Sequence, residues 1–344
     1  MLKKTISILL AIALVGLLVA CGGGRAATPA QGGAGAGGAS PGGGEVMQLR
    51  LSHNQPDFSA YDNAARLFKE LIEERSNGRF EITIFPNNQL GTQEEVTEAV
   101  MLGNIDLVVT SDDRLIAFAN EWGALGMPFL FDDFDHVYAA VNGTAGAYLN
   151  DLIARSNMYV ISWLENGFRH VTNDRGPIYT PEDIAGLRMR VLSSLPAMAF
   201  MDRAGASVLN ISFSELYAAL QLGAVNSQEN PLHNIRERSF YEVQTYLSLI
   251  GYVHTVQPML MSLRLLNSLS AEDQQLFREV GREVSTFAFQ QAMADEDAHL
   301  AYLSNHMIIN TVDRDAFADV VQAVWEEFGE EYGYVIEMIR AYAN

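Results

Sequence analysis

The sequence predicts an α/β protein of two domains with mixed, mostly parallel sheets. Strand-like and helix-like stretches alternate from residue 48 onward, which is typical of parallel sheets flanked by helices. The stretch 105–110 (IDLVVT) is nearly continuous in apolar residues, which indicates a sheet covered on both faces. The chain has 344 residues, and this length favours two domains over one.

The predicted first domain begins with a β-α-β-α-β succession. Strands are predicted at 48–53, 79–85 and 105–110, and helices at 58–75 and 92–102. The first helix shows apolar residues at helical spacing. Thr92 and Glu95 form a capping box that opens the second helix, and Gly103 ends it. This order predicts parallel strand pairs with helices packed on both sides.

The pattern restarts in the second half of the chain. The predicted elements are a strand at 158–164, a short helix from Pro181, a strand at 187–191, a helix from Ser212 to Gly223 and a strand at 224–230. A longer helix is predicted from Ser270 to about Met307, and the remainder also reads as helical. A helix of this length is roughly 50 Å long, so we expect it to brace both domains.

The first 21 residues read as a targeting segment. Lys3 and Lys4 precede an apolar run at 6–19, which is shorter than the roughly 20 residues that a spanning helix needs. The run ends in LVAC, which resembles a bacterial lipobox and predicts lipidation at Cys21. An ordinary signal peptide with a chance cysteine is the alternative. Residues 22–45 are rich in glycine, and we expect a flexible tether there.

Composition excludes several classes of function. The formal net charge of -20 argues against a nucleic-acid partner and against electrostatic docking on anionic lipid. Cys21 is the only cysteine, which excludes an intramolecular disulfide and a cysteine-based catalytic or metal site. The seven histidines have no clear metal spacing, and no G-x-S-x-G, Walker or H-E-x-x-H motif occurs. We therefore expect no metal, no cofactor and no enzyme activity.

The strand 187–191 (LRMRV) places Arg188 and Arg190 on one side of an otherwise apolar strand. Ligands of doubly wound sheets bind beyond the carboxyl ends of the strands, and Arg190 lies nearer that end. Other polar residues also follow predicted strands, namely Asn54, Asp112 and Asn230. We expect these groups to converge on one cleft. From the residues alone, Arg190 could equally pair with a fixed acidic residue or with a ligand.

Six stretches, taken in order, are similar to those of a known family. They are FPNNQLGTQEEV (85–96), MPFLF (127–131), ENGFRHVTN (165–173), TPEDIAGLRMRV (180–191), FSELYAALQLGAVNSQENP (213–231) and FYEVQTYLSL (240–249). Together they resemble the substrate-binding proteins of tripartite ATP-independent periplasmic (TRAP) transporters, the DctP-like family. The resemblance covers nearly all of the mature chain.

The resemblance implies a periplasmic-binding-protein-like architecture, in which two α/β domains enclose a cleft and a long helix braces both. The predicted divisions are a lipoprotein signal peptide at 1–21, the tether at 22–45, domain I at 46–167 plus 255–296, and domain II at 168–254 plus 297–344. The domains are expected to close on a ligand in the cleft between them.

The resemblance also implies an extracytoplasmic solute receptor. The predicted lipidation at Cys21 would anchor this receptor to the outer face of the cytoplasmic membrane. It would bind a small organic acid, by default a C4-dicarboxylate or a related hydroxy or keto acid. It would deliver this acid to membrane permease subunits for uptake driven by an ion gradient. The main alternative is a sensory lipoprotein that feeds a signalling receptor. A hydrolase on the same architecture would need a general base or nucleophile at the cleft, and the sequence shows no convincing pair.

The family motif G-L-x-x-R-V places its ligand-binding arginine at Arg190, where it would form a salt bridge with the ligand carboxylate. A guanidinium in a closed cleft is costly unless an anion pairs with it, and a carboxylate can do so through two parallel hydrogen bonds. By position, the resemblance implies further ligand contacts at Arg169, Asn230, Phe213, Asn54 and Arg114. The alternative for Arg169 is a structural role at the domain crossover, and the alternative for Phe213 is packing in the core. Ser111 and Asp112 lie beside Arg114 and are candidates for setting which ligand is accepted. Trp163 and Glu165 are weaker candidates, and they could equally belong to the hinge.

The chain departs from the family pattern at three places. Asn226-Ser227 replaces the usual Asp-Gly, which predicts a changed turn and the loss of a charge near the site. Leu192 stands where proline is common. Tyr252 and His254 follow the YLSL strand in a shifted order, which predicts that a phenol or an imidazole faces the ligand. Arg188 is expected on the domain surface or in a supporting ion pair.

Overall fold

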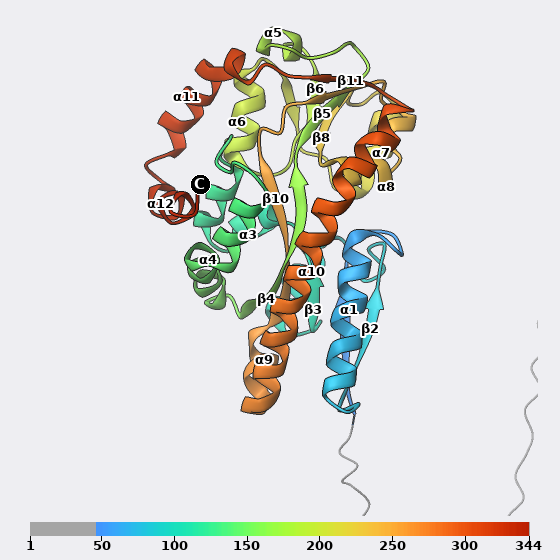
Figure 1. Cartoon of the computed structure of the whole chain (residues 1–344), viewed down its shortest axis with the longest axis vertical. Coiled ribbons are helices and arrows are strands. Elements are labelled where there is room, and N and C mark those ends of the chain that lie inside the picture. Colours follow the sequence, from blue (N-terminus) through green and yellow to red (C-terminus); the bar gives the residue numbers. More distant parts are fainter. Residues whose placement is uncertain (1–45, 344) are drawn as a thin grey trace, which may run out of the picture. The chain divides into compact units, whose positions relative to one another are not determined.

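A computed structural model of the protein describes residues 46–343, and these contain two β-sheets (Figure 1). The first sheet has the order β2-β1-β3-β10-β4, with β1 (Met47–Ser52), β2 (Phe80–Phe85), β3 (Leu107–Val109), β4 (Met158–Phe168) and β10 (His254–Ser262). The second has the order β11-β9-β5-β8-β6-β7, with β5 (His170–Asn173), β6 (Arg188–Arg190), β7 (Ser207–Leu209), β8 (Ser227–Asn230), β9 (Tyr246–Leu249) and β11 (Ile308–Thr311). The predicted signal peptide, Cys21 and the tether lie outside the described residues.

Both sheets mix parallel and antiparallel pairs. In the first sheet, β1 runs parallel to β2 and β3, whereas β10 runs antiparallel to β3 and β4. In the second sheet, β6 runs parallel to β7 and β8, β11 runs parallel to β9, and β5 is antiparallel to β8 and β9. The predicted α/β class with mixed sheets is therefore confirmed.

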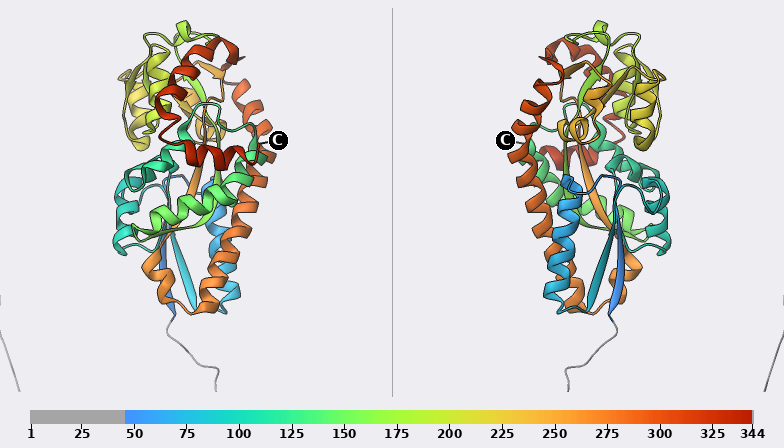
Figure 2. Two further views of the ribbon diagram at one scale, coloured as in Figure 1. Left: turned by 90° about the vertical axis from the view of Figure 1, so that its left-hand side faces the viewer. Right: turned by 90° about the vertical axis from the view of Figure 1, so that its right-hand side faces the viewer.

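Helices surround the two sheets (Figures 1 and 2). The α-helices are α1 (Ala60–Arg75), α2 (Gln93–Leu102), α3 (Phe134–Asn142), α4 (Thr144–Ala154), α5 (Pro181–Ile184), α6 (Leu195–Arg203), α7 (Leu216–Gln221), α8 (Leu232–Glu237), α9 (Leu263–Ser268), α10 (Ala271–Ser304), α11 (Ala318–Phe328) and α12 (Gly333–Arg340). Short 3₁₀ helices are η1 (Asp112–Ala117), η2 (Asn120–Gly126), η3 (Phe213–Glu215), η4 (Phe240–Glu242) and η5 (Arg314–Phe317). None of the described helices has both the length and the apolar character that crossing a membrane requires.

The chain passes between the sheets three times. It leaves the first sheet where β4 leads into β5, returns from β9 to β10, and leaves again along α10 to reach β11. The helix α10 has 34 residues and contacts β4, α1 and α8, so the predicted long helix that spans both sheets is confirmed (Figure 2). The crossings lie near the predicted domain boundaries, although α12 packs against α3 and α4 beside the first sheet. The division into two domains stays a prediction.

Local capping signals explain where the helices near the cavity begin. The Thr92 hydroxyl accepts from the Glu95 amide at 3.3 Å, the Glu95 carboxylate accepts from the Thr92 amide at 2.9 Å, and Gly103 ends α2 with a φ of 78°. The predicted helix from Ser212 is wrong in detail, because the chain forms η3 and only then the short α7. The Ser212 hydroxyl donates to the Glu215 side chain and does not cap the backbone.

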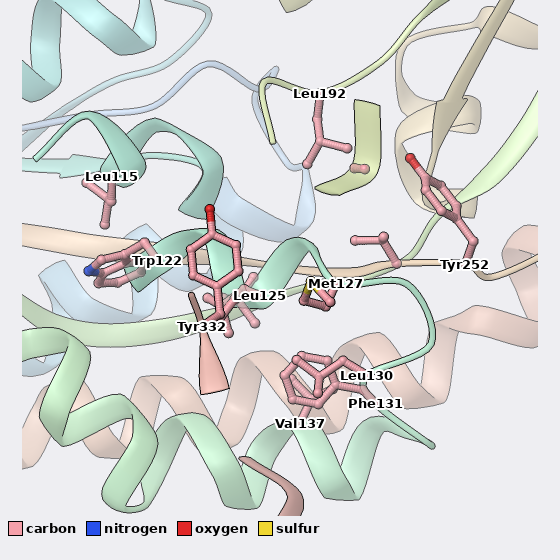
Figure 3. Close-up of a cluster of buried hydrophobic side chains, with 14 of the residues drawn as sticks. Leu115, Trp122, Leu125, Met127, Leu130, Phe131, Val137, Leu192, Tyr252 and Tyr332 are labelled. Atoms are coloured by element: carbon pink, nitrogen blue, oxygen red, sulfur yellow. The ribbon is translucent and has the colours of Figure 1, made fainter. Parts of the chain in front are cut away.

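The largest of the buried apolar clusters in the described residues joins the surroundings of both sheets (Figure 3). Trp122, Met127 and Phe131 belong to η2 and the segment that follows it, whereas Leu192 follows β6 and Tyr252 lies between β9 and β10. A continuous core of this kind holds the strand ends of the two sheets in a defined arrangement.

Candidate ligand-binding site

A cavity of about 360 Å³, counting the solvent at its mouth, lies where strands of both sheets end. Its lining residues come from the loops after β1 and β3, from α1, α2, η1 and β4, from the connection between β4 and β5, and from β6, η3, β8, α8 and β10. They are Asn54, Gln55, Tyr61, Gln93, Ser111, Asp113, Arg114, Asn166, Arg169, Arg190, Phe213, Asn230, Asn234 and Gln257. The structure thus brings together all six residues that the sequence predicts as ligand contacts, while their role in binding stays a prediction.

Arg190 is the last residue of β6, and only 3% of its surface is exposed. Its Nε donates to the Ile211 carbonyl at 3.0 Å, and its guanidinium carbon lies 5.9 Å from the centre of the Phe213 ring. No carboxylate of residues 46–343 lies within ion-pair distance of it. Burial lowers the pKa of Arg190 to about 10 against the opposing effect of Glu229, so the side chain stays charged at neutral pH.

Arg169 is also buried, but it has a partner within the protein. Its guanidinium forms an ion pair with Glu229, with one Nη2 to Oε1 distance of 3.1 Å. The same Nη2 donates to the Asn230 Oδ1 at 3.1 Å. Burial alone would lower the pKa of Arg169, but the charge of Glu229 and the hydrogen bond to its carboxylate, together with smaller charge effects, outweigh burial and the pKa is raised. The positive charge of Arg169 is therefore compensated before any ligand binds.

Arg114 lies on η1 and is also compensated. Its Nη1 lies 2.7 Å from the Glu94 carboxylate, and its Nε lies 3.9 Å from the Asp113 carboxylate. Burial would raise the pKa of Asp113, but the charge of Arg114 and the hydrogen bonds to the carboxylate together outweigh burial, and the pKa is lowered. Asp113 in turn accepts from the Ser193 amide at 2.9 Å. Of the three arginines that line the cavity, only Arg190 has no acidic partner among residues 46–343.

The two sides of the cavity contact each other. Gln55, after β1, donates to the Asn234 Oδ1 on α8 at 2.6 Å, and Arg114 donates to the Ser193 hydroxyl after β6 at 3.2 Å. Arg238 donates to the Asn54 carbonyl. These bonds join the segments that line the two sides of the cavity.

Two expectations about residues near β10 are wrong. The Tyr252 ring stacks on Phe200 with their centres 4.9 Å apart, and its hydroxyl does not line the cavity. His254 is buried and its Nε2 lies 2.6 Å from the Glu165 carboxylate, so its imidazole does not face the cavity either. Glu165 belongs to this buried pair, and Trp163 stacks on Trp122 at 5.4 Å. The side chains of Trp163 and Glu165 therefore pack in the buried interior and do not line the cavity.

The expectation that the Asn226-Ser227 replacement removes a charge near the site is also wrong. These residues lie at the start of β8, whereas the cavity lies at its other end, beyond Asn230. The Asn226 Oδ1 accepts from the Arg188 amide at 2.9 Å. The Arg188 side chain is exposed and donates to the Gly223 carbonyl at 2.9 Å, so its predicted surface position is confirmed.

Sequence reasoning missed most of the amides in the cavity. They are Gln55, Gln93, Asn166, Asn234 and Gln257. Two of them carried a usable signal, because Gln55 directly follows Asn54 beyond β1 and Gln93 is the first residue of the capped helix α2. The others depend on how distant segments pair. Within residues 46–343, no cluster of three or more His, Cys, Asp or Glu side chains could hold a metal ion.

Two mixed sheets with crossing strands, and a polar cavity where strands of both sheets end, are typical of an α/β solute-binding protein. The family model of the bacterial extracellular solute-binding proteins, family 7, matches residues 51–331. The chain belongs to this family, the substrate-binding proteins of TRAP transporters. The family consists of extracytoplasmic solute receptors for transport and not of enzymes.

Relatives agree with this assignment over most of the chain. A solute-binding protein of Verminephrobacter eiseniae is 31% identical over 86% of this chain and 89% of its own length. The sugar acid-binding protein of Advenella mimigardefordensis in complex with galactonate has a TM-score of 0.83 and 26% identity, covering 87% of this chain and 99% of that chain. A TRAP solute-binding protein of Sulfurospirillum deleyianum with bound succinate has a TM-score of 0.80 and 27% identity, covering 86% and 98%.

Proposed function

We propose that the chain is the receptor of a TRAP transporter and binds a small organic acid through an ion pair between the acid's carboxylate and Arg190. One observation carries the proposal: a buried guanidinium faces the cavity, and no carboxylate of residues 46–343 pairs with it. An uncompensated buried charge is costly, and a ligand carboxylate removes that cost with two parallel N–H···O bonds. A buried arginine without a partner is therefore a receptor for an anion.

Neighbouring residues support this role. Phe213 lies against the Arg190 guanidinium and would pack on the carbon skeleton of the acid. Asn54 and Asn230 line the same cavity and would hydrogen-bond the ligand. Arg169 would act mainly by orienting Asn230, to which it is bonded at 3.1 Å. The bound galactonate and succinate of the two similar structures support an organic acid as the ligand class.

We propose further that the receptor is anchored by lipid at Cys21 and delivers its acid to TRAP permease subunits for uptake driven by an ion gradient. The LVAC sequence before the glycine-rich segment supports the anchor, and membership of the family supports the permease. Cells fed a labelled fatty acid should label the wild type and not Cys21→Ser. Equal labelling of both proteins would contradict the anchor.

A thermal-shift screen of organic acids against residues 46–344 tests the binding function. An acid at 100 times its Kd adds about 2.7 kcal/mol to the free energy of unfolding, which gives a clear rise in Tm. Uncharged amides or alcohols of the same skeletons should give no rise, because they cannot compensate the guanidinium charge. Equal shifts with the uncharged analogues would refute the ion pair, and no shift with any acid would refute organic-acid binding.

A further inference from the structure

The cavity has two walls of different chemistry. The cationic wall comes from the second sheet and consists of Arg190, Arg169 and Phe213. The amide wall comes from the first sheet and its helices and consists of Asn54, Gln55, Gln93 and Gln257. A ligand whose carboxylate lies on the cationic wall must present its remaining atoms to the amide wall.

The amide wall has unmet hydrogen-bonding capacity. Four buried atoms on it have no partner among the described residues, namely the Asn54 Oδ1, the Gln55 Oε1, the Gln257 Oε1 and the Gln93 Nε2. The other amides of the cavity are bonded within the protein, as when Asn234 donates to the Asn166 Oδ1 at 3.0 Å. A buried polar group without a partner is costly, and unpaired groups gathered in one cavity indicate a ligand that pairs with them.

The amide wall selects hydroxyl groups over a second carboxylate. An amide side chain has an NH₂ group that donates and an oxygen that accepts, whichever way the amide is turned, and a hydroxyl can pair with either group. An ionised carboxylate only accepts, so it would leave the amide oxygens unpaired. The charges near the amide wall also disfavour a second carboxylate. Asp113 is an acidic residue on the same side of the cavity, and the charge of Arg114 is already paired with Glu94 at 2.7 Å.

We propose that the ligand is a polyhydroxylated monocarboxylate of the aldonate type, with its carboxylate at Arg190 and its hydroxyls on the amide wall. This inference rests on the proposed function and narrows it. It disfavours the C4-dicarboxylate that the sequence predicts by default, because residues 46–343 provide one uncompensated cation at the cavity and not two.

Acids of matched length test the inference by calorimetry. The four-carbon set is D-erythronate, succinate and butyrate, and the six-carbon set is D-galactonate, adipate and hexanoate. We expect the hydroxylated monoacid of at least one set to bind at least tenfold tighter than its two counterparts. If a diacid or a plain monoacid binds as tightly in both sets, the inference is wrong and the proposed function stands. If none of the six binds, the inference is also wrong, and the screen of organic acids decides separately whether the proposed function stands.

Gln257→Met tests the amide wall itself, since methionine keeps the length of the side chain and removes the amide. We expect the affinity for the hydroxylated acid to fall about tenfold and the affinity for the plain acid to stay unchanged. The Tm without ligand should stay equal or rise, because the lost amide oxygen has no partner within the described residues. Gln93→Met provides a second, independent variant with the same expectation.

Gln244→Met is the matched control. Gln244 is buried too, but it accepts from Thr172 at 3.0 Å and donates to Asp174 at 2.9 Å. Its loss should lower the Tm and leave the preference for hydroxylated acids intact. If Gln257→Met lowers the Tm in the same way and leaves the preference for hydroxylated acids unchanged, Gln257 has a structural role and the amide wall does not determine which ligand is bound.

Discussion

Arg190→Ala is the substitution with the largest expected effect on binding. It removes the guanidinium that faces the cavity, so we expect the affinity for the acid to be lost. The stability of the ligand-free protein should be retained or raised, because no carboxylate within the described residues forms an ion pair with this buried charge. Lost binding without lost stability would distinguish a receptor residue from a structural one.

The magnitude follows from the burial of the side chain. Burial lowers the pKa of Arg190 from 12.5 to about 10. One pKa unit corresponds to about 1.4 kcal/mol, so the charged form costs the folded protein on the order of 3 kcal/mol. A ligand carboxylate relieves this cost and adds a charge-assisted hydrogen bond of about 1.5–3 kcal/mol. The affinity should therefore fall roughly 10³- to 10⁴-fold.

Calorimetry with the acid found in the screen measures the affinity, and urea unfolding without ligand measures the stability. Arg190→Lys keeps the charge but not the planar fork, and it should also weaken binding strongly. Arg169→Met is the contrasting variant, since it leaves the buried Glu229 carboxylate without its partner and should cost about 3–5 kcal/mol of stability. The reasoning is refuted if Arg190→Ala binds within tenfold of the wild type, or if it destabilises the ligand-free protein as much as Arg169→Met does.

Four further substitutions test the fold and the site. Alanine usually stabilises a helix by about 1 kcal/mol over glycine, but a Cβ at Gly281 would lie 1.8 Å from the Ile161 carbonyl oxygen. Gly281→Ala should therefore lower the urea midpoint, whereas Gly333→Ala, with no atom within 4 Å, should leave it equal or raise it. Burial lowers the pKa of His233 to about 3, so at pH 5 this side chain is neutral in the folded protein but protonated in the unfolded chain. The free energy of unfolding therefore keeps the full contribution of His233 above pH 6.5 and is about 2 kcal/mol lower at pH 5. His233→Gln should lose less stability between pH 7 and pH 5, and an equally steep loss would contradict this reasoning. Phe213→Ala should weaken acid binding about tenfold by calorimetry and change the ligand-free Tm little, since the ring is only partly buried.

The parts of the site that sequence could predict are those with local signals. The capping box of Thr92 and Glu95 starts α2 where Gln93 can reach the cavity, and it needs only four consecutive residues to be recognised. Arg190 could be placed because alternation and strand direction assign it to the carboxyl end of β6. The end of α10 was less predictable. The strand β11 follows Ser304 closely, and its partly exposed residues show no clear alternation of apolar and polar side chains.

The partner of Arg169 could not be predicted, because it depends on the pairing of distant strands. Glu229 lies 60 residues further along the chain. The antiparallel register of β5 and β8 sets His170 opposite Asn230, and this brings Arg169 and Glu229 together. Before the register is known, Arg169 and Arg190 look alike as cations near strand ends. The register of β5 and β8 determines that Arg169 is paired with Glu229, whereas the charge of Arg190 stays uncompensated.

The acidic side chains near Arg190 are already bonded to other groups, which explains how Arg190 stays unpaired in a chain with a net charge of -20. Glu229 influences the pKa of Arg190, but its carboxylate already accepts from Arg169 and, at 2.9 Å, from the Leu192 amide. Asp113 is held by the Ser193 amide at 2.9 Å and by the charge of Arg114. Turning either carboxylate toward Arg190 would break these bonds inside a buried site, which costs more than a single new ion pair returns. The cavity can therefore bind an external anion because the nearby carboxylates are already bonded to other groups of the protein. A substitution that removes the bonds of Glu229 or Asp113 should weaken ligand binding, even where the substituted residue does not contact the ligand.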